Sequence, residues 1–191
     1  AAGRVLAASI VSDVDVPGFD RATMDGYAVV ADSTEGATAY SPLPLKVIGD
    51  SMPGCPYGGF VFAGSAVRIM TGAPMPRGAD AVLPAEWVEA APDHISALTA
   101  VSPGKNIGRR GEDIVHGTTL LEAGRVLRPQ DLGVLSSIGH GEVCVVRKPR
   151  VRLAITGNEL LPSGTRPLGF QIADANGPML AALIERDGGL V

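Results

Sequence analysis

The stretch Ser65-Ala-Val-Arg-Ile-Met70, which runs directly into Thr71-Gly-Ala-Pro74, sets the pattern for the first half of the chain. A short apolar run that ends at glycine and proline is typical of a β-strand followed by a tight turn. We therefore predict a β-rich, barrel-like domain over residues 14–112. Five further runs of the same kind lie in this region: Gly26–Val30, Leu43–Ile48, Ala79–Leu83, Glu86–Ala90 and His94–Leu98.

The composition agrees with a chain of short strands. It contains 25 glycines and 15 prolines among 191 residues, which favours many turns over a helical bundle. A net charge of −4 and an aromatic content of 4% argue against a nucleic-acid partner. No apolar run is long enough for a membrane span, and two cysteines are too few for a disulfide scaffold or a zinc knuckle. We therefore expect a cytoplasmic protein with no nucleic-acid and no membrane partner.

Residues 1–13 and 113–147, on either side of this region, have a mixed pattern. Ala1–Ser12 is rich in alanine and fits either a short helix or a strand. Pro129 in a first turn and Gly139 after the last turn indicate one helix between them. We predict that the two segments form one small mixed α/β domain, into which residues 14–112 are inserted. Its short β runs are Thr119–Leu121, Arg125–Leu127 and Glu142–Val146.

A third pattern occupies residues 148–191. Val151–Thr156 is a β run, and Pro178 and Gly188 bracket a helix ahead of Leu190-Val191. Strand, helix and strand in this order predict a βαβ unit of a parallel sheet. A parallel sheet needs further strands and cover on both faces. We therefore predict a multidomain α+β protein whose last segment begins a parallel α/β domain that is cut short.

Three aspartates lie close together ahead of the first strong β run: Asp15, Asp20 and Asp25. An Asp–Gly pair at the head of a strand is common turn chemistry, which is one interpretation of Asp25-Gly26. The other interpretation is that Asp25 projects into a cleft as a metal ligand, because Mg²⁺ binds one or two carboxylates together with substrate phosphates.

Two further polar segments are candidates for binding an anion. Thr71-Gly72 offers a hydroxyl and backbone N–H groups at the end of a strand, although a plain tight turn has the same sequence. Arg109 and Arg110 lie beside acidic residues that include Asp113. This second segment is either a solvated surface loop or a guanidinium clamp for a phosphate.

The segment Thr156-Gly157-Asn158-Glu159 follows the predicted strand of the third region. Ligands of open α/β sheets bind at the carboxyl ends of strands, so Glu159 is a candidate site residue; the alternative is that it caps or solvates the loop. Neither a GxGxxG nor a Walker A pattern is present, which disfavours a dinucleotide-binding or P-loop enzyme.

Taken together and in this order, the motifs resemble those of one family over essentially the whole chain. That family is the molybdopterin molybdenumtransferases, called MoeA in bacteria and the E domain of gephyrin in animals. The resemblance implies a role in molybdenum cofactor synthesis, in which adenylated molybdopterin and molybdate react, AMP leaves and Mg²⁺ serves as the cation. The matching motifs are Asp15-Val-Pro-Gly-Phe-Asp20, Met24-Asp-Gly-Tyr-Ala-Val29, Arg68-Ile-Met-Thr-Gly-Ala-Pro74, Arg109-Arg-Gly-Glu-Asp113 and Thr156-Gly-Asn-Glu-Leu160.

The resemblance also implies roles for individual residues and partners. It implies a homodimer whose active cleft is shared between the subunits, and molybdopterin adenylyltransferase as the upstream partner. Mg²⁺ would be held by Asp25 and Glu159. The implied catalytic residues are Asp25, Thr71 and Asp113 of the β-rich domain and Glu159 of the molybdopterin-binding domain. The implied substrate-binding or anion-binding residues are Gly72, Arg109, Arg110, Thr156, Gly157 and Asn158.

The chain departs from the family pattern in two respects. Asn158 stands where members usually have aspartate, which removes a charge beside Glu159. The sequence also ends before the later loops of the molybdopterin-binding domain, so we expect the 191 residues alone to be inactive. Two alternatives to the enzyme stay open, a non-catalytic scaffold of the gephyrin E-domain type and a nucleotide-binding module of another transferase.

Overall fold

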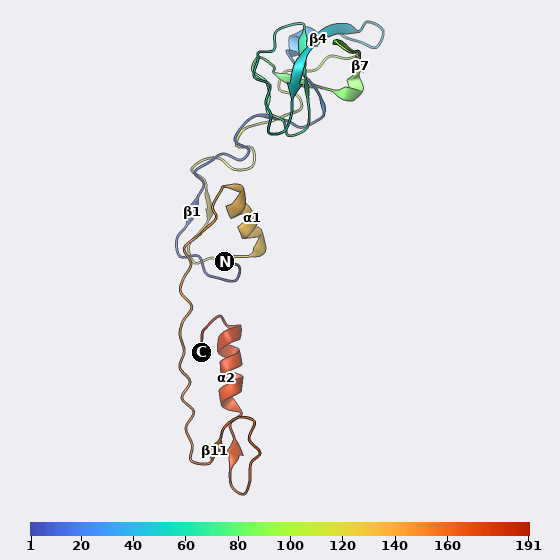
Figure 1. The fold of residues 1–191 in the computed structure, drawn as a ribbon. Coiled ribbons are helices and arrows are strands. Elements are labelled where there is room, and N and C mark those ends of the chain that lie inside the picture. Colours follow the sequence, from blue (N-terminus) through green and yellow to red (C-terminus); the bar gives the residue numbers. More distant parts are fainter. The chain divides into compact units, whose positions relative to one another are not determined.

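The computed structural model describes residues 1–191, and Figure 1 shows its helices and strands coloured along the sequence. Contacts within the chain divide these residues into two units. The β unit is Ser12–Thr118, and the flanking unit is Ala1–Val11 together with Thr119–Val191. The structure is mostly β, with two α-helices that both belong to the flanking unit. The division into three domains drawn from the sequence stays a prediction.

The β unit is built on a six-stranded sheet with the order β6-β3-β5-β4-β8-β7. The β4–β5 pair is parallel and the other four pairs are antiparallel. Each β run expected in this region forms a strand, so the all-β prediction for it is confirmed. The strands are β3 (Gly26–Val29), β4 (Leu43–Ser51), β5 (Ser65–Ile69), β6 (Ala81–Pro84), β7 (Val88–Ala90) and β8 (His94–Ala97).

The smaller elements of the β unit were not expected from the sequence. Two 3₁₀ helices, η1 (Ala31–Thr34) and η2 (Ala85–Trp87), follow β3 and β6, and η2 takes the place of the first part of the expected run Glu86–Ala90. Two very short strands, β2 (Arg21–Ala22) and β9 (Ile107–Gly108), pair with each other outside the main sheet.

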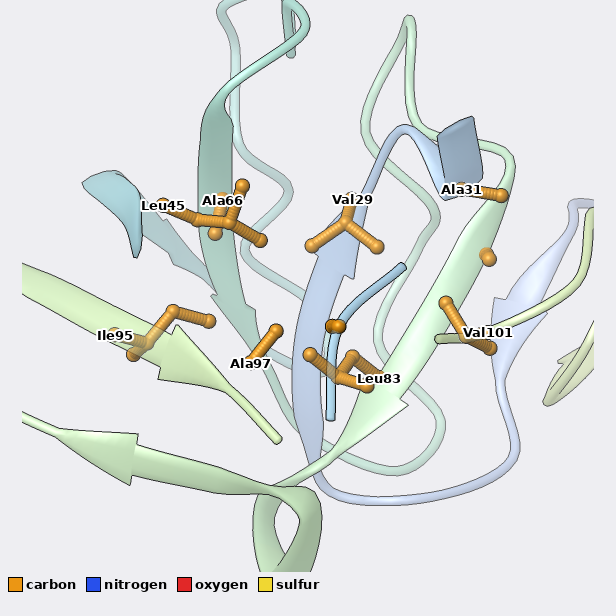
Figure 2. Close-up of a cluster of buried hydrophobic side chains, with 10 residues drawn as sticks. Val29, Ala31, Leu45, Ala66, Leu83, Ile95, Ala97 and Val101 are labelled. Carbon is orange, nitrogen blue, oxygen red and sulfur yellow. The ribbon is translucent and has the colours of Figure 1, made fainter. Parts of the chain in front are cut away.

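The core of the β unit consists of two clusters of buried side chains, to which β3 contributes alternate residues. Val29 belongs to the first cluster with Leu45, Leu83 and Ile95, and Figure 2 shows these side chains gathered beside the sheet. Ala28 belongs to the second cluster, which includes Val61, Val67, Ile69 and Val82. Successive residues of a strand point to opposite faces, so the sheet is covered on both sides.

In the flanking unit, the first residues of the chain pair with residues 119–145. Strand β1 (Ile10–Val11) pairs antiparallel with β10 (Thr119–Leu121), and Val5 and Leu6 form isolated bridges to Val126 and Val145. The strand alternative for Ala1–Ser12 is therefore confirmed and the helix alternative is wrong. The other expected runs here, Arg125–Leu127 and Glu142–Val146, contribute only these bridges.

Helix α1 (Pro129–Ser137) begins at the expected proline and is anchored by a buried carboxylate. Asp131 is 3% exposed, and its carboxylate oxygens accept hydrogen bonds from Arg125 Nε at 3.0 Å and Nη2 at 2.9 Å. The backbone N–H of Arg128 also donates to Asp131 Oδ2, at 2.9 Å, which satisfies a donor at the start of the helix.

The expected strand Val151–Thr156 is absent, which corrects the sequence prediction (Figure 1). Only an isolated parallel bridge joins Arg150 to Leu190, with a hydrogen bond of 2.7 Å from Val151 N to Leu190 O. A parallel strand forms with a neighbouring strand along its length, and a single bridge does not supply one. The expected helix is confirmed as α2 (Asn176–Arg186). Neither α-helix has the length and apolar character that a membrane span requires.

Candidate functional site

Three motifs that lie far apart in the sequence meet in the β unit. Strand β2 pairs antiparallel with β9, and Thr23 N donates to Asn106 O at 3.0 Å. On the other side, Ala22 N donates to Ala73 O at 3.0 Å, and Gly72 N donates to Ala22 O at 2.8 Å. The Asp20–Asp25 segment therefore lies between the Thr71–Pro74 turn and the loop that contains Arg109 and Arg110.

Asp25 and Thr71, two of the expected site residues, contact each other directly. Asp25 Oδ1 accepts hydrogen bonds from the backbone N–H and from the hydroxyl of Thr71, both at 2.7 Å. No protein group donates to Oδ2. The Thr71 backbone N–H, then its hydroxyl and then the charge of Arg68 lower the pKa of Asp25 below its ordinary value, so the group is ionised at neutral pH.

Gly26 fixes the place of Asp25 at the head of β3. A side chain at this position would overlap the carbonyl oxygen of Leu83 on the neighbouring strand β6. Asp25 O also accepts a hydrogen bond from Ala85 N at 3.1 Å. In the Asp25-Gly26 pair, the glycine therefore lets the backbones of β3 and β6 approach closely, and the aspartate supplies the carboxylate.

A cavity of about 590 Å³ lies beside Asp25, and its lining includes Tyr27 and Val47, which pack against the first core cluster. Its polar lining consists of Asp25, Tyr27, Asp50 and Arg68. Its apolar lining includes Val47, Met70 and Pro92. This volume lies in the range of small-molecule binding sites, and the mixed lining suits a ligand with one charged end.

Arg109 and Arg110 are exposed, and each contacts an aspartate of the first motif. Arg109 Nη1 lies 2.7 Å from Asp20 Oδ2, and Arg110 Nε lies 2.6 Å from Asp15 Oδ2. Backbone N–H donation from Arg110 to Asp20, and from His116 to Asp15, is the largest cause of the lowered pKa of each carboxylate. The arginine loop is therefore held against the Asp15–Asp20 segment by charge-assisted hydrogen bonds.

Asp113 is exposed and forms a long ion pair with Arg21, with 3.8 Å between Arg21 Nη2 and Asp113 Oδ2. It belongs to the same loop as Arg109 and Arg110, but no hydrogen bond joins it to Asp25 or Thr71. Among the expected residues of the β unit, the closest association is therefore the Asp25–Thr71 pair, with Gly72 next to it in the turn.

Thr156, Gly157, Asn158 and Glu159 form an exposed loop of the flanking unit. The loop leads into β11 (Leu160–Leu161), which pairs parallel with β12 (Ile172–Ala173). Gly157 O accepts a hydrogen bond from Leu160 N at 3.2 Å, and Glu159 O accepts one from Ile172 N at 2.8 Å. These bonds use backbone groups, so the carboxylate of Glu159 stays available to a ligand.

Metal binding in this chain would depend on ligands besides its own side chains. No group of three or more histidine, cysteine, aspartate or glutamate side chains is placed to hold an ion. Mg²⁺ usually keeps several waters and takes one or two carboxylates together with substrate oxygens. Asp25, ionised and with Oδ2 free of protein donors, fits that mode of binding.

Three cavity residues were given no role from the sequence: Tyr27, Asp50 and Arg68. Arg68 is the one exposed residue of β5, whose other four residues are buried. The sequence signal for Arg68 was its position within the apolar run Ala66-Val-Arg-Ile-Met70. Charged residues are rare in buried strands, so an arginine there indicates a functional or pairing role.

Comparisons with known proteins define the class to which this fold and these motifs belong. The family model described as "MoeA N-terminal region (domain I and II)" matches residues 1–139. The chain belongs to the MoeA family, as its motifs indicated.

Named relatives extend this similarity to nearly the full chain. The chain is 40% identical over 189 residues to molybdopterin molybdenumtransferase 2 of Mycobacterium tuberculosis, which covers 99% of the chain and 46% of the relative. It is 36% identical to molybdopterin molybdenumtransferase of Staphylococcus aureus, covering 96% and 44%. A crystal structure of a molybdopterin biosynthesis MoeA protein from Pyrococcus horikoshii matches with a TM-score of 0.90 and 41% identity, covering 99% of the chain and 48% of that structure. The chain thus spans about half the length of these relatives.

Proposed function

We propose that this chain provides part of a molybdopterin molybdenumtransferase, which inserts molybdenum from molybdate into adenylated molybdopterin with release of AMP. The observation that carries the proposal is the Asp25–Thr71 pair beside a cavity of about 590 Å³. The names of the relatives support the substrates. The scaffold alternative has no comparable observation in its favour.

Asp25 and Thr71 act as one unit in this proposal. Thr71 holds Asp25 Oδ1 through two hydrogen bonds, which orients the carboxylate and leaves Oδ2 for a ligand. Mg²⁺ would be held by Asp25, with Glu159 as the second proposed carboxylate, and when bound it would neutralise oxygens of the phosphoanhydride that breaks. A preorganised carboxylate avoids reorganisation during the reaction.

The loop from Arg109 to Asp113 contributes positive charge next to the aspartates of the first motif. Arg109 and Arg110 offset the negative charges of Asp20 and Asp15, so the approach of an anionic substrate meets less repulsion. In the proposal Asp113 and Gly72 face the same substrate, and Thr156, Gly157 and Asn158 contact it from the molybdopterin-binding part. The family resemblance further supports a homodimer with a shared cleft and delivery of the substrate by molybdopterin adenylyltransferase.

The test uses the protein expressed from its complete reading frame. Asp25→Ala and Glu159→Ala should each lower the rate of AMP release on the order of 10²-fold, because each removes a charge that organises the transition state. Thr71→Ala should lower it less, because Asp25 keeps its charge and the backbone N–H bond. Glu35→Ala, at an exposed position outside the cavity, is the matched control and should leave the rate unchanged. Near-normal turnover of Asp25→Ala would contradict the proposed site.

A further inference from the structure

We propose that the cavity beside Asp25 binds a tetrahedral oxyanion through the guanidinium of Arg68, which makes Arg68 a substrate-binding residue of the β unit. The source of the anion rests on the proposed function: it is either the phosphate of the leaving nucleotide or molybdate. Both have oxygens in a geometry that a guanidinium fork matches with two hydrogen bonds.

Arg68 differs from the other arginines of the β unit because its guanidinium has no hydrogen-bond partner and no ion-pair partner. Arg21 pairs with Asp113, Arg109 with Asp20 and Arg110 with Asp15. Arg77 donates from Nη2 to Gly58 O at 3.3 Å. The only interaction of Arg68 is the longer-range attraction that helps to lower the pKa of Asp25. The N–H groups of the Arg68 guanidinium are therefore free to donate hydrogen bonds to a ligand.

The sheet register places Arg68 in the cavity between polar neighbours. Tyr27 of β3 lies directly opposite Arg68 in the antiparallel pair, and Asp50 of β4 is its partner in the parallel pair. The β4–β5 register shifts between Val47 and Asp50, and a bulge of this kind re-aims a side chain. All three line the cavity with Asp25, so a bound anion would contact the guanidinium and lie within reach of the Tyr27 ring.

The two carboxylates of the cavity limit how tightly a free anion binds. Asp25 and Asp50 bring two negative charges against the single positive charge of Arg68. Removal of the Asp50 charge should therefore strengthen anion binding, whereas removal of the Arg68 charge should weaken it. Opposite changes of anion affinity in Arg68→Gln and Asp50→Asn would show that the cavity selects its ligand by charge. A change in folding alone would not produce opposite changes.

The experiment measures binding of AMP, inorganic phosphate and molybdate to the 191-residue chain by isothermal titration calorimetry, with and without Mg²⁺. Arg68→Gln should raise Kd at least about tenfold for the anion that the cavity takes, since hydrogen bonds to charged groups are worth that much. Arg68→Lys should fall in between, because it keeps the charge but loses the fork. Asp50→Asn should lower Kd.

Arg77→Gln is the matched control, because it makes the same change of charge on an arginine outside the cavity. Thermal unfolding of each variant verifies that it is folded. Equal Kd values for Arg68→Gln and the unchanged chain, an equal loss in Arg77→Gln, or no binding of any of the three anions overturns the proposal.

The three anions separate the two sources and separate this proposal from the proposed function. Preference for AMP and phosphate assigns Arg68 to the nucleotide, and preference for molybdate assigns it to the metal oxyanion. Arg68-dependent binding without transferase activity in the complete protein would contradict the function and leave the anion site. Transferase activity that survives Arg68→Gln with an unchanged KM would contradict the anion site and leave the function.

Discussion

The β unit and residues 148–191 of the flanking unit bury their apolar side chains to very different extents. Every residue of β6 is buried, and the sheet of the β unit carries a core cluster on each face. Helix α2 has no buried residue, and Met179, Leu180 and Leu183 are exposed. The hydrogen bonds of a helix join residues close in sequence, whereas those of a parallel strand join it to a neighbouring strand. The segment around α2 forms its helix, and Val151–Thr156 forms no strand.

The largest expected effect that sharpens this comparison is on stability. Ile95→Ala in the first core cluster should lower the free energy of unfolding by about 2–5 kcal/mol, because Ile95 is 0% exposed and a cavity would remain. Leu183→Ala, at a side chain that is 36% exposed, should cost less than about 1 kcal/mol. Urea unfolding followed by circular dichroism measures both. Similar losses in the two variants would contradict the difference in packing between these regions.

A smaller but more specific loss is expected at the head of β3. Gly26→Ala should destabilise the β unit by about 1–3 kcal/mol, because the new methyl group would overlap Leu83 O and force the strands apart. Gly58→Ala, where an added methyl group would meet nothing within 4 Å, is the control and should be nearly neutral. Both are measured by urea unfolding. If Gly26→Ala proves as stable as its control, the close approach of β3 and β6 is not a constraint on the motif.

The smallest expected effect is a pH dependence of the flanking unit. Hydrogen bonds from Arg125, then Arg128, hold the pKa of Asp131 well below its usual range, which is about 3.9 in an unfolded chain. The folded pKa is depressed, so the stabilisation is complete above that unfolded pKa and is lost as pH falls through the folded value.

Asp131→Asn should therefore flatten the acid dependence of stability below about pH 4. The measurement is the melting temperature between pH 2 and pH 7. Asp32→Asn, at an exposed aspartate of the other unit, serves as the comparison for a general loss of charge. An unchanged acid profile in Asp131→Asn would show that the carboxylate does not anchor α1 through its charge.

The parts of the fold that were predictable are those with local signals. Turn residues around runs such as Ser65–Met70 located the strands, and Pro129 and Gly139 located α1. The sheet order was not predictable, because it depends on pairings such as β3 with β6 across more than fifty residues. The expected strand Val151–Thr156 failed for the same reason, since its stability is a property of its neighbours.

The sequence identified candidate residues of the site but did not predict which of them contact each other. The motifs supplied Asp25 and Thr71, but their contact arises because Ala22 pairs with Ala73 and brings the two segments side by side. Arg68 was missed because its neighbours in sequence are apolar, and only the register of β3, β4 and β5 places it with Tyr27 and Asp50.

The place where the chain enters and leaves the β unit has a practical consequence. Ser12 N donates to Thr118 O at 2.9 Å, and Gly117 N donates to Ser12 O at 2.7 Å, so the two ends of the unit already touch. Val11 and Thr119, the residues just outside, are themselves strand partners. The β unit can thus be excised and circularised with a very short linker, and the remaining chain can be rejoined by a tight hairpin, at little cost in loop-closure entropy for either piece.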